Sequence, residues 1–391
     1  MKKNIGILEY HYHTKYLFTK AKIVKIKDTN VTIFTTKDLY NKLKVYIKNI
    51  SDYDIVVKDE KESISSFLKK VKNICNERID LLFVNTIQET LLDLPHFLNF
   101  KPSCKMVLTI HSVNSWFKKT PEINYKKIVK SIDTTINSYL TKKILKNFNA
   151  INVIYPPIKK NILKEYHFKK PIYTLPFGFY NKELASKQTK RRYNEILFVI
   201  PGQIEEHRRD YDFVLRVFKK IFEKNKEKIR LILLGFASGR YGTQIINKCI
   251  KMQEKGYNIN FYEKYVPEEE FNIIMKNADF LILPIKIQTY GLGARKEYYG
   301  KTKGSAAVFE AIQYAKPLIV PDEFEITKDM SKSILRYKNQ NDFENKISKL
   351  INDVEEIKKY KKNALINSEK FSIDSLQKYF TEEILNKIDN I

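Results

Sequence analysis

Glycines gather in the second half of the chain, in a pattern suited to binding phosphate. Of the 11 glycines, only Gly6 and Gly178 precede Gly202, and the rest fall between Gly202 and Gly304. A glycine lets the backbone approach a ligand closely, and the amide groups at a helix start attract an anion. We therefore expect the phosphate-facing loops to lie in the second half.

The first candidate loop, 201–211, follows an aliphatic strand and precedes a helical pattern. It opens with Gly202 and carries Arg208 and Arg209 just before the helix. Arginine is electrostatically unfavourable at a helix N-terminus unless an anion is bound there, and its guanidinium group pairs well with phosphate oxygens. These three residues are candidate diphosphate ligands. The alternative is a solvated basic helix start.

The second candidate loop, 298–311, runs into a helix through small residues at positions 304–307. Lys303, Gly304 and Ser305 would expose this helix start to phosphate. Glu310 lies about two turns further on, where it could accept hydrogen bonds from ribose hydroxyls. Alternatively, Glu310 is a surface residue of the helix.

Three histidines follow predicted strands in the first half. His11 and His13 come after the first strand, and His111 ends the strand 106–110. Two imidazoles at this spacing could be metal ligands, yet no matching Cys or acidic cluster is visible. Contact of His11 and His13 with an acceptor or a phosphate is the preferred interpretation. A structural role for His111 remains an alternative to a role in the site.

Aromatic and basic residues are mixed at Trp116, Phe117, Lys118 and Lys119, and again over 125–130. Such a mixture suits an interfacial membrane segment, with aromatic rings at headgroup depth and lysines on anionic lipid. It would equally suit stacking on single-stranded nucleic acid. Ordinary helix packing with exposed lysines is the third interpretation.

Short aliphatic strands alternate with helical patterns through the whole chain. We predict strands at 5–8, 31–35, 54–57, 81–85, 106–110, 150–154, 196–200, 230–234, 260–263, 280–283, 318–320 and 334–337. The clearest helical patterns lie at 62–75, 134–145, 210–223, 242–255, 267–276, 306–314 and 342–350. This alternation predicts an α/β protein with two doubly wound, Rossmann-like lobes, each with a parallel sheet covered on both faces.

A polar, basic stretch at 186–194, preceded by Pro176 and Gly178, marks the expected boundary between the lobes. The predicted domains are an acceptor-side lobe at 1–175 and a nucleotide-binding lobe at 190–356. Residues 357–391 are expected to form two more helices, the last packing back on the first lobe.

Charge and cysteine content restrict the environment. The net charge is +26, and residues 1–170 hold 32 Lys+Arg against 15 Asp+Glu. This favours an anionic partner or, alternatively, reflects only a solvated basic surface. The 3 cysteines are unclustered, as expected for buried thiols in a reducing compartment. No apolar run could span a bilayer, and no signal peptide is expected. We expect a cytoplasmic protein.

At this point the sequence resembles the GT-B glycosyltransferases, specifically the large retaining group that uses nucleotide-sugar donors (family 4-like, glycosyl transferases group 1). The likeness covers most of the chain and is strongest from Glu195 to Pro321. It is carried by Gly202 with the motif at 209–212, by 231–235, by 260–284, and most specifically by 309–312 followed by 315–321.

The resemblance implies roles for single residues. Arg209 would take the diphosphate, Glu310 the ribose, and the loop at Tyr265 and Val266 would lie against the base. His111 resembles the histidine that projects from the first lobe towards the donor sugar.

Two positions depart from the family pattern. Where the family commonly has a glutamate seven residues before the second one, this chain has Thr302, and Glu297 is out of register. The resemblance therefore implies two candidate catalytic residues: Thr302, which stands at this position, and His111. The glycine-rich loop expected after the first strand is replaced by 9–13, which has no glycine.

The leading hypothesis is a hexosyl-type, metal-independent and retaining glycosyltransferase, using a UDP- or GDP-sugar and no cofactor. The acceptor would be a glycan, a lipid-linked or another anionic molecule, with an anionic membrane surface as a further partner. A nucleotide-sugar 2-epimerase and an inactive polyanion- or membrane-binding protein are the alternatives. Glycosylation of a nucleic acid is a less favoured variant.

Overall fold

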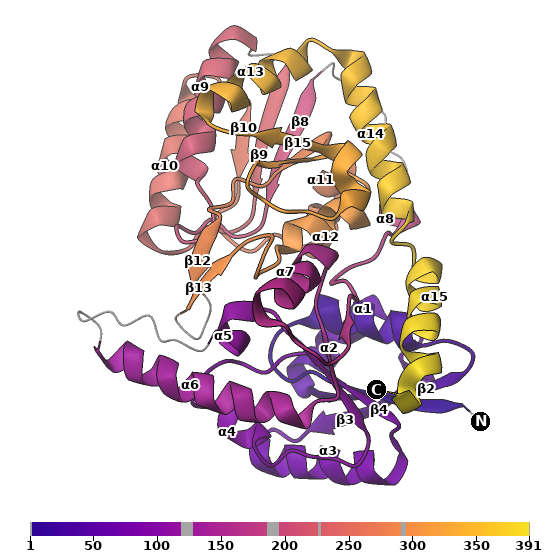
Figure 1. The fold of residues 1–391 in the computed structure, drawn as a ribbon. Helices are drawn as coiled ribbons and strands as arrows, with labels where there is room; N and C mark the ends of the chain where they lie inside the picture. Colours follow the sequence, from indigo (N-terminus) through magenta and orange to yellow (C-terminus); the bar gives the residue numbers. More distant parts are fainter. Residues whose placement is uncertain (1, 119–127, 186–194, 226–227, 291–294, 391) are drawn as a thin grey trace. The chain divides into compact units, whose positions relative to one another are not determined.

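Two compact units make up the computed structural model of this chain (Figure 1), which describes residues 2–118, 128–185, 195–225, 228–290 and 295–390. The first unit contains Met1–Gly178, Tyr290–Gly304 and Ile373–Ile391. The second contains Phe179–Thr289 and Ser305–Ser372. The chain therefore leaves the first unit and returns to it twice.

A seven-stranded parallel sheet forms the centre of the first unit, in the order β3-β2-β1-β4-β5-β6-β7. Its central strands are almost wholly buried because helices cover both faces. The strands are β1 Lys3–Leu8, β2 Thr29–Thr36, β3 Asp54–Lys58, β4 Leu81–Val84, β5 Lys105–Thr109, β6 Ala150–Asn152 and β7 Ile172–Tyr173.

Helices of very different length surround this sheet. Those between the strands are α1 Thr14–Val24, α2 Lys37–Tyr46, η1 Ile50–Asp52, α3 Ile64–Arg78, α4 Leu94–Phe97, α5 Val113–Phe117, α6 Ile128–Asn147 and α7 Pro156–Tyr166. Ser63 caps α3, because its hydroxyl accepts the N–H of Ser66 at 3.1 Å. Later segments of the chain add β13 Lys296–Tyr298, α15 Ile373–Glu383 and η4 Leu385–Asn390.

Polar contacts fix α1 against the carboxyl end of the sheet. The Tyr16 hydroxyl lies 3.0 Å from Thr109 Oγ1 and accepts Asn152 Nδ2 at 2.9 Å. Asn152 Oδ1 in turn accepts the N–H of Leu175 at 2.7 Å. All three side chains are buried, so these hydrogen bonds satisfy groups that would otherwise be costly to bury. They also hold the start of α1, next to His13, in a fixed position.

Lys20, also on α1, is an unusual core residue. Its ammonium group is fully buried without a hydrogen-bond partner and lies 4.7 Å from the Phe83 ring centroid and 5.0 Å from that of Tyr16. Burial lowers the pKa of Lys20 well below its ordinary value. The two rings attract a cation but replace only part of its lost hydration.

We therefore expect Lys20→Met to stabilise the first unit by about 2 kcal/mol, because methionine fills a similar volume and has no charge to desolvate. Thermal unfolding would show a raised melting temperature. Lys20→Ala is the matched control and should lower it, because it leaves a cavity. A lower melting temperature for Lys20→Met would show that the amine is stabilising where it is.

The helix α15 belongs to the first unit although it lies at the end of the chain. Gln377 Nε2 donates to the carbonyl oxygens of Lys22 at 2.9 Å and Lys25 at 3.0 Å, which caps the end of α1. The ring centroids of Phe380 and Phe83 lie 6.3 Å apart. This helix therefore completes the α1 face of the first sheet.

The second unit has a six-stranded parallel sheet in the order β10-β9-β8-β11-β14-β15. Its strands are β8 Ile196–Pro201, β9 Ile229–Leu234, β10 Ile259–Phe261, β11 Phe280–Ile282, β14 Leu318–Pro321 and β15 Ile334–Tyr337. Its helices are α8 Lys182–Ala185, α9 Tyr211–Asn225, α10 Gly239–Glu254, α11 Glu268–Asn277, α12 Ala306–Gln313, η3 Lys328–Ser333, α13 Gln340–Ile351 and α14 Val354–Glu369. The strand β12 Gln288–Tyr290 lies where the chain passes back to the first unit.

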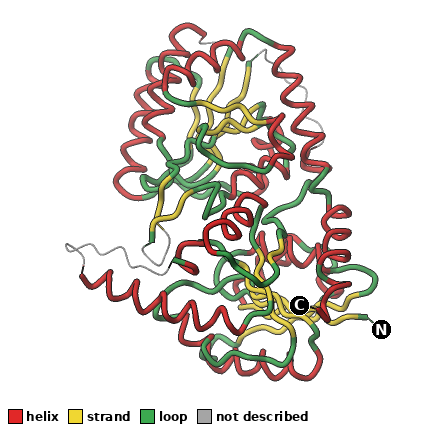
Figure 2. Tube along the Cα trace, viewed as in Figure 1, coloured by secondary structure: helices red, strands yellow, loops and turns green. Residues whose placement is uncertain are grey.

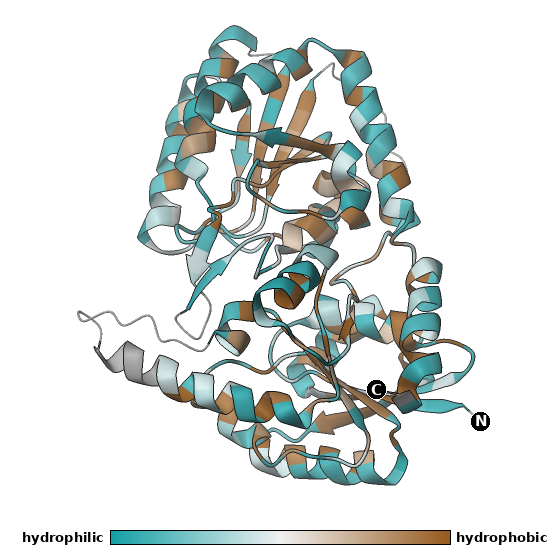
Figure 3. Ribbon diagram, viewed as in Figure 1, coloured by the Kyte–Doolittle hydropathy of each residue, from teal (hydrophilic) through white to brown (hydrophobic). Residues whose placement is uncertain are grey.

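Figure 2 marks the helices and strands of each unit, and Figure 3 shows that apolar residues concentrate on the strands and the inward faces of the helices. In the second unit the core is built around Phe198, Phe218 and Phe280, all fully buried. Phe198 packs its ring 5.4 Å from that of Phe218 on α9, and 5.8 Å from that of Phe280 on β11. The amphipathic pattern of 210–223 therefore places α9 as predicted.

The predicted fold class, two doubly wound Rossmann-like lobes, is confirmed. Every predicted strand is present, while the short strands β7, β12 and β13 were not predicted. The grouping of 290–304 with the first unit was not foreseen either, because its sequence lies in the middle of the predicted nucleotide-binding lobe. Among the described residues, no helix has the length and apolar character needed to cross a bilayer.

Candidate functional site

Each sheet has one position where the order of its strands reverses direction. In the first unit this is between β1 and β4, and in the second between β8 and β11. Open parallel sheets bind ligands outside the carboxyl ends of the strands at such a switch point. The loops that follow β1, β4, β8 and β11 are therefore the first places to look for chemistry.

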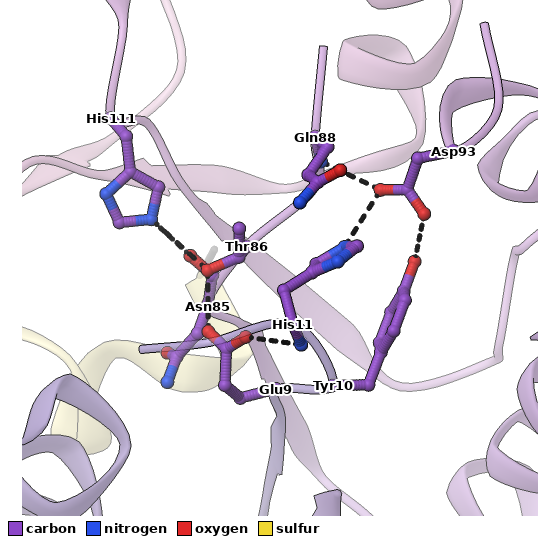
Figure 4. Close-up of polar contacts among 8 residues, drawn as sticks. All are labelled: Glu9, Tyr10, His11, Asn85, Thr86, Gln88, Asp93 and His111. Atoms are coloured by element: carbon purple, nitrogen blue, oxygen red, sulfur yellow. Dashed lines mark hydrogen bonds and ion pairs between the residues drawn. The ribbon is translucent and has the colours of Figure 1, made fainter. Parts of the chain in front are cut away.

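Glu9 and Thr86 join the two loops at the switch point of the first unit (Figure 4). Thr86 Oγ1 donates to Glu9 Oε2 at 2.6 Å, and the backbone N–H of His11 donates to Glu9 Oε1 at 2.9 Å. Glu9 is fully buried, and this desolvation raises its pKa although both hydrogen bonds oppose the rise. The sequence pattern indicated that the loop at 9–13 was important, but it did not predict a role for Glu9.

His11 is held by an acid that sequence reasoning missed. Its Nε2 lies 3.0 Å from Asp93 Oδ2, which also accepts the N–H of Gln88 at 2.7 Å, and Asp93 Oδ1 accepts the Tyr10 hydroxyl (Figure 4). Nothing in the pattern around Asp93 marks it, since it stands in a loop far from His11 in sequence.

His13 and His111 lie face to face, with ring centroids 4.8 Å apart. His111 Nε2 lies 2.7 Å from the carbonyl oxygen of Asn85, which can only accept, so Nε2 carries a hydrogen. Burial lowers the pKa of His111 to about 4 and that of His13 to about 2. Both rings are thus neutral near pH 7, and His111 keeps the lone pair of Nδ1.

Lys303 brings a positive charge to these histidines from a distant part of the sequence. Its Nζ donates to Ser112 Oγ at 3.2 Å, and its charge contributes to the lowered pKa values of His13 and His111. Lys303 also acts on the buried Glu89, lowering a pKa that burial raises. The first unit therefore gathers neutral imidazoles, a cation and buried acids at one switch point.

Among the described side chains, no group of three or more His, Cys, Asp or Glu residues is arranged to hold a metal ion.

Trp116 does not form part of an exposed aromatic surface, and that prediction is wrong. Its side chain is 4% exposed, and its indole N–H donates to Glu89 Oε1 at 2.9 Å. Phe117 is partly buried, with its ring 5.2 Å from that of Tyr166, and Lys118 is also half-buried. The amphipathic indole satisfies a buried acid here instead of facing solvent. Lys119 lies outside the described residues.

Glu297 anchors the returning segment 290–304 to α5. Its Oε1 accepts the N–H of Ser115 at 3.0 Å, and its Oε2 accepts the N–H of Asn114 at 3.2 Å. Thus the acid that is out of register with the family pattern is a ligand of two backbone amides. Burial raises its pKa to about 7, against the lowering by hydrogen bonds from Thr302, Asn114 and Ser115 and by the charge of Lys303.

Thr302 is a turn residue in this structure. Its Oγ1 accepts the N–H of Tyr298 at 2.7 Å, and its own N–H donates to Tyr298 O at 2.8 Å. Its carbonyl accepts the N–H of Val113 at 2.9 Å, which ties the turn to α5. Gly304 follows in tight contact, since a Cβ there would lie 1.9 Å from Ile154 Cδ1. Thr302 itself is 5% exposed.

The titration of Glu297 predicts a pH effect on stability. Its folded pKa of about 7 lies above the ordinary 4.5, so the folded chain holds extra protons in that window. The free energy of unfolding therefore falls as pH rises from 4.5 to 7, by up to about 3 kcal/mol. The pKa shift of His111 has the opposite effect on stability, because its folded pKa of about 4 lies below the ordinary 6.5. The free energy of unfolding therefore falls as pH is lowered from 6.5 to 4.

Since His111 and His13 oppose Glu297 below pH 6.5, the prediction is a difference between proteins. Relative to Glu297→Gln, the unmodified chain should lose melting temperature as pH is raised from 5 to 8. Melting curves of both proteins in the same buffers measure this. If the difference in melting temperature between the two proteins is the same at every pH, Glu297 stays ionised in the folded chain.

The switch point of the second unit holds the predicted glycine and arginine loop. Gly202 follows β8 with φ +98°, and Gly235 follows the neighbouring β9 so closely that a Cβ there would lie 2.1 Å from Gly202 O. Arg209 lies over this turn: its Nη1 donates to Gln203 O at 2.9 Å. A Cβ on Gly202 would lie 2.6 Å from Arg209 Nη2. The structure thus brings Gly202 and Arg209 together.

Backbone pairing holds the arginine loop to the segment after β11, across the switch point. The N–H of Asp210 donates to Pro284 O at 2.8 Å, and that of Lys286 donates to Arg208 O at 2.9 Å. Arg208 itself is exposed, with its Nε 3.0 Å from Glu205 Oε1. The two arginines therefore differ: Arg209 is on the glycine turn, and Arg208 is paired at the surface.

The remaining predicted residues of the second unit lie on or beside α12 and in the loop after β10. Ser305 occupies the N-cap position of α12 and is buried, while Glu310 is partly buried on that helix. Tyr265 is exposed and Val266 is buried in the loop that follows β10.

No protein-family model matches the chain, and no curated protein matches it in sequence. Solved structures do match in fold. Sucrose-phosphate synthase from Thermosynechococcus elongatus has a TM-score of 0.65 and 13% identity, with 100% of both chains covered. The E. coli trehalose-6-phosphate protein bound with UDP-2-fluoro glucose has a TM-score of 0.59 and 11% identity, covering 100% of this chain and 99% of that one.

A UDP-N-acetylglucosamine 2-epimerase matches as well, with a TM-score of 0.55, 11% identity, and coverage of 100% of this chain and 98% of that one. At such identities the likeness concerns the fold. The chain has a GT-B-like fold, which is shared by glycosyltransferases and nucleotide-sugar epimerases.

Proposed function

We propose that this protein is a glycosyltransferase that takes a sugar from a nucleotide-diphosphate-sugar donor. The observation that carries the proposal is the arginine on the glycine turn after β8, at the switch point of the second sheet. Two glycines without room for a Cβ let the backbone after β8 pack closely against the backbone after β9, with the Arg209 side chain over the turn. A cation beside them matches a diphosphate.

The leaving diphosphate is the group that such a site must stabilise. Negative charge grows on it as the bond to the sugar breaks, and fixed cations and amides can stabilise that charge without reorganising. Arg209, with its planar guanidinium group, would bind two phosphate oxygens at once. Ser305 at the N-cap of α12 and Glu310 within that helix would hold the rest of the nucleotide, with Tyr265 and Val266 against the base.

The first unit would supply the acceptor side. His111 and His13 are neutral near pH 7, and Lys303 adds a positive charge near them. A neutral imidazole with a lone pair on Nδ1 can accept a proton from an acceptor hydroxyl, while Lys303 favours an anionic group on the acceptor. The acceptor class on this proposal is a hydroxyl-bearing, anionic molecule.

The test is a thermal-shift panel of nucleotides and nucleotide sugars, followed by product analysis with the best donor. A true donor should raise the melting temperature by mass action, and its diphosphate should do so as well. Transfer to an acceptor or slow hydrolysis of the donor should follow. If no nucleotide diphosphate or nucleotide sugar stabilises the protein, the proposal fails.

The 2-epimerase is the second candidate, because an enzyme of that class shares the fold over the full chain. Incubation of the donor without any acceptor separates the two. An epimerase converts the sugar of the intact donor, whereas a transferase releases the diphosphate.

A further inference from the structure

The outer face of α6 combines apolar and basic side chains in one stripe. Ile136, Tyr139, Lys143 and Lys146 recur at helical spacing, and Lys142 lies beside them. Ile136 is 42% and Tyr139 57% exposed, and Lys143 Nζ lies 4.5 Å from the Tyr139 ring centroid. We call these five residues the α6 face. Its aromatic and aliphatic members lie towards one end and its lysines towards the other.

The opposite side of α6 is firmly packed, so the α6 face is the side left for solvent. Ile144 is fully buried, and Asn137 Nδ2 donates to Glu89 O at 3.2 Å. That bond also places the loop 89–93 directly beside the helix, and Figure 1 shows α6 next to α4, which follows this loop. The loop contains Leu91 and Leu92, the latter 86% exposed.

We propose that the α6 face and the leucine pair Leu91–Leu92 dock the protein on an anionic lipid surface. Exposed aliphatic side chains in this number are unfavourable in water and suit the boundary between headgroups and acyl chains. The lysines suit anionic headgroups, and the surrounding sequence is strongly basic, with 32 Lys+Arg against 15 Asp+Glu in residues 1–170. The helix would lie in the plane of the interface.

A lipid surface fits these residues better than nucleic acid. Single-stranded nucleic acid is bound by stacking on aromatic rings along a basic groove. Here the exposed apolar groups are mainly aliphatic, and Tyr139 is the one aromatic member of the α6 face. The aromatic pair that suggested stacking, Trp116 and Phe117, is turned inward in the structure.

The chain offers closely matched control residues on α14, in the second unit. Lys358, Lys359 and Lys362 have the same sequence spacing as Lys142, Lys143 and Lys146, and all six are exposed. Leu365 and Ile366 form an adjacent exposed apolar pair, as Leu91 and Leu92 do. The two sets of variants therefore change net charge by the same amount, and each removes one adjacent pair of exposed apolar side chains.

The experiment is co-sedimentation of the full chain with phosphatidylcholine vesicles, with and without phosphatidylglycerol. We expect binding that requires phosphatidylglycerol and weakens with salt. Changing all three α6 lysines to Gln should weaken it about a hundredfold, and Leu91→Ser with Leu92→Ser about tenfold or more. The matched α14 variants should bind as the unmodified protein does.

Unchanged melting temperatures would show that all four variants fold. The proposal is overturned if phosphatidylglycerol does not increase binding, or if the α14 variants lose as much affinity as the α6 variants. It is also overturned if a single-stranded oligonucleotide binds through the α6 lysines while the vesicles do not. None of these outcomes depends on sugar transfer, so the result stands apart from the proposed activity.

Discussion

Arg209→Ala should lower kcat/KM for the nucleotide-sugar donor at least a hundredfold, about 3 kcal/mol of transition-state stabilisation. Arg209 is the cation on the glycine turn after β8, and its guanidinium group is already oriented by Gln203 O at 2.9 Å. The charge on a leaving diphosphate would lose its nearest fixed partner. Lysine should not restore the activity, because a single ammonium group cannot bind two oxygens in a plane.

Steady-state kinetics, together with the thermal shift produced by the nucleotide diphosphate, measure this effect. Arg216→Ala is the matched control, since Arg216 is an exposed arginine on α9 and should leave both quantities unchanged. The melting temperature without ligand shows whether losing the bond to Gln203 disturbs the turn. Normal turnover and normal nucleotide stabilisation in Arg209→Ala would remove the phosphate assignment.

Gly235→Ala should cost about 3 kcal/mol or more of stability and abolish donor binding with it. The added Cβ would meet backbone atoms, namely Gly202 O at 2.1 Å and Gly202 C at 2.3 Å. No rotamer change can relieve such a contact, so the turn after β8 must move. Because Arg209 is seated on that turn, its position relative to the ligand would change too.

Gly239→Ala provides the comparison. Gly239 has φ +61°, and a Cβ there would meet nothing within 4 Å. This substitution should cost about 1 kcal/mol, from the left-handed backbone alone, and should leave nucleotide stabilisation intact. Melting curves of the two variants, with and without the nucleotide diphosphate, separate crowding at the turn from backbone strain. Equal losses in both would mean that the close approach of Gly235 to Gly202 is unimportant.

Structural elements that depend on a local sequence pattern were predictable from the sequence. The apolar strands gave the two parallel sheets, and the uneven glycines indicated the loop in which Gly202 and Gly235 meet. Arg209 could be singled out because a cation before a helix start is unfavourable without an anion. These signals are local, so a single sequence contains them.

Contacts between distant segments were not predictable. Asp93 contacts His11 and Tyr10 from a loop with no motif, and Glu297 contacts the amides of Asn114 and Ser115 from 183 and 182 residues further along the chain. Trp116 shows the reverse error. Its neighbours suggested an exposed surface, but the buried Glu89 offers its indole N–H a partner. Which polar group becomes buried depends on tertiary packing, and composition does not reveal it.

Residues near the end of the chain complete the first unit, and this restricts when that unit can fold during synthesis. Phe380, Ile384 and Ile388 are almost fully buried, although they belong to the last residues of the chain. A ribosome delivers the N-terminal strands long before these side chains emerge. The apolar surface that they cover in the first unit therefore stays open until residues from 373 onward have emerged. The unit whose strands are made first cannot be completed before that.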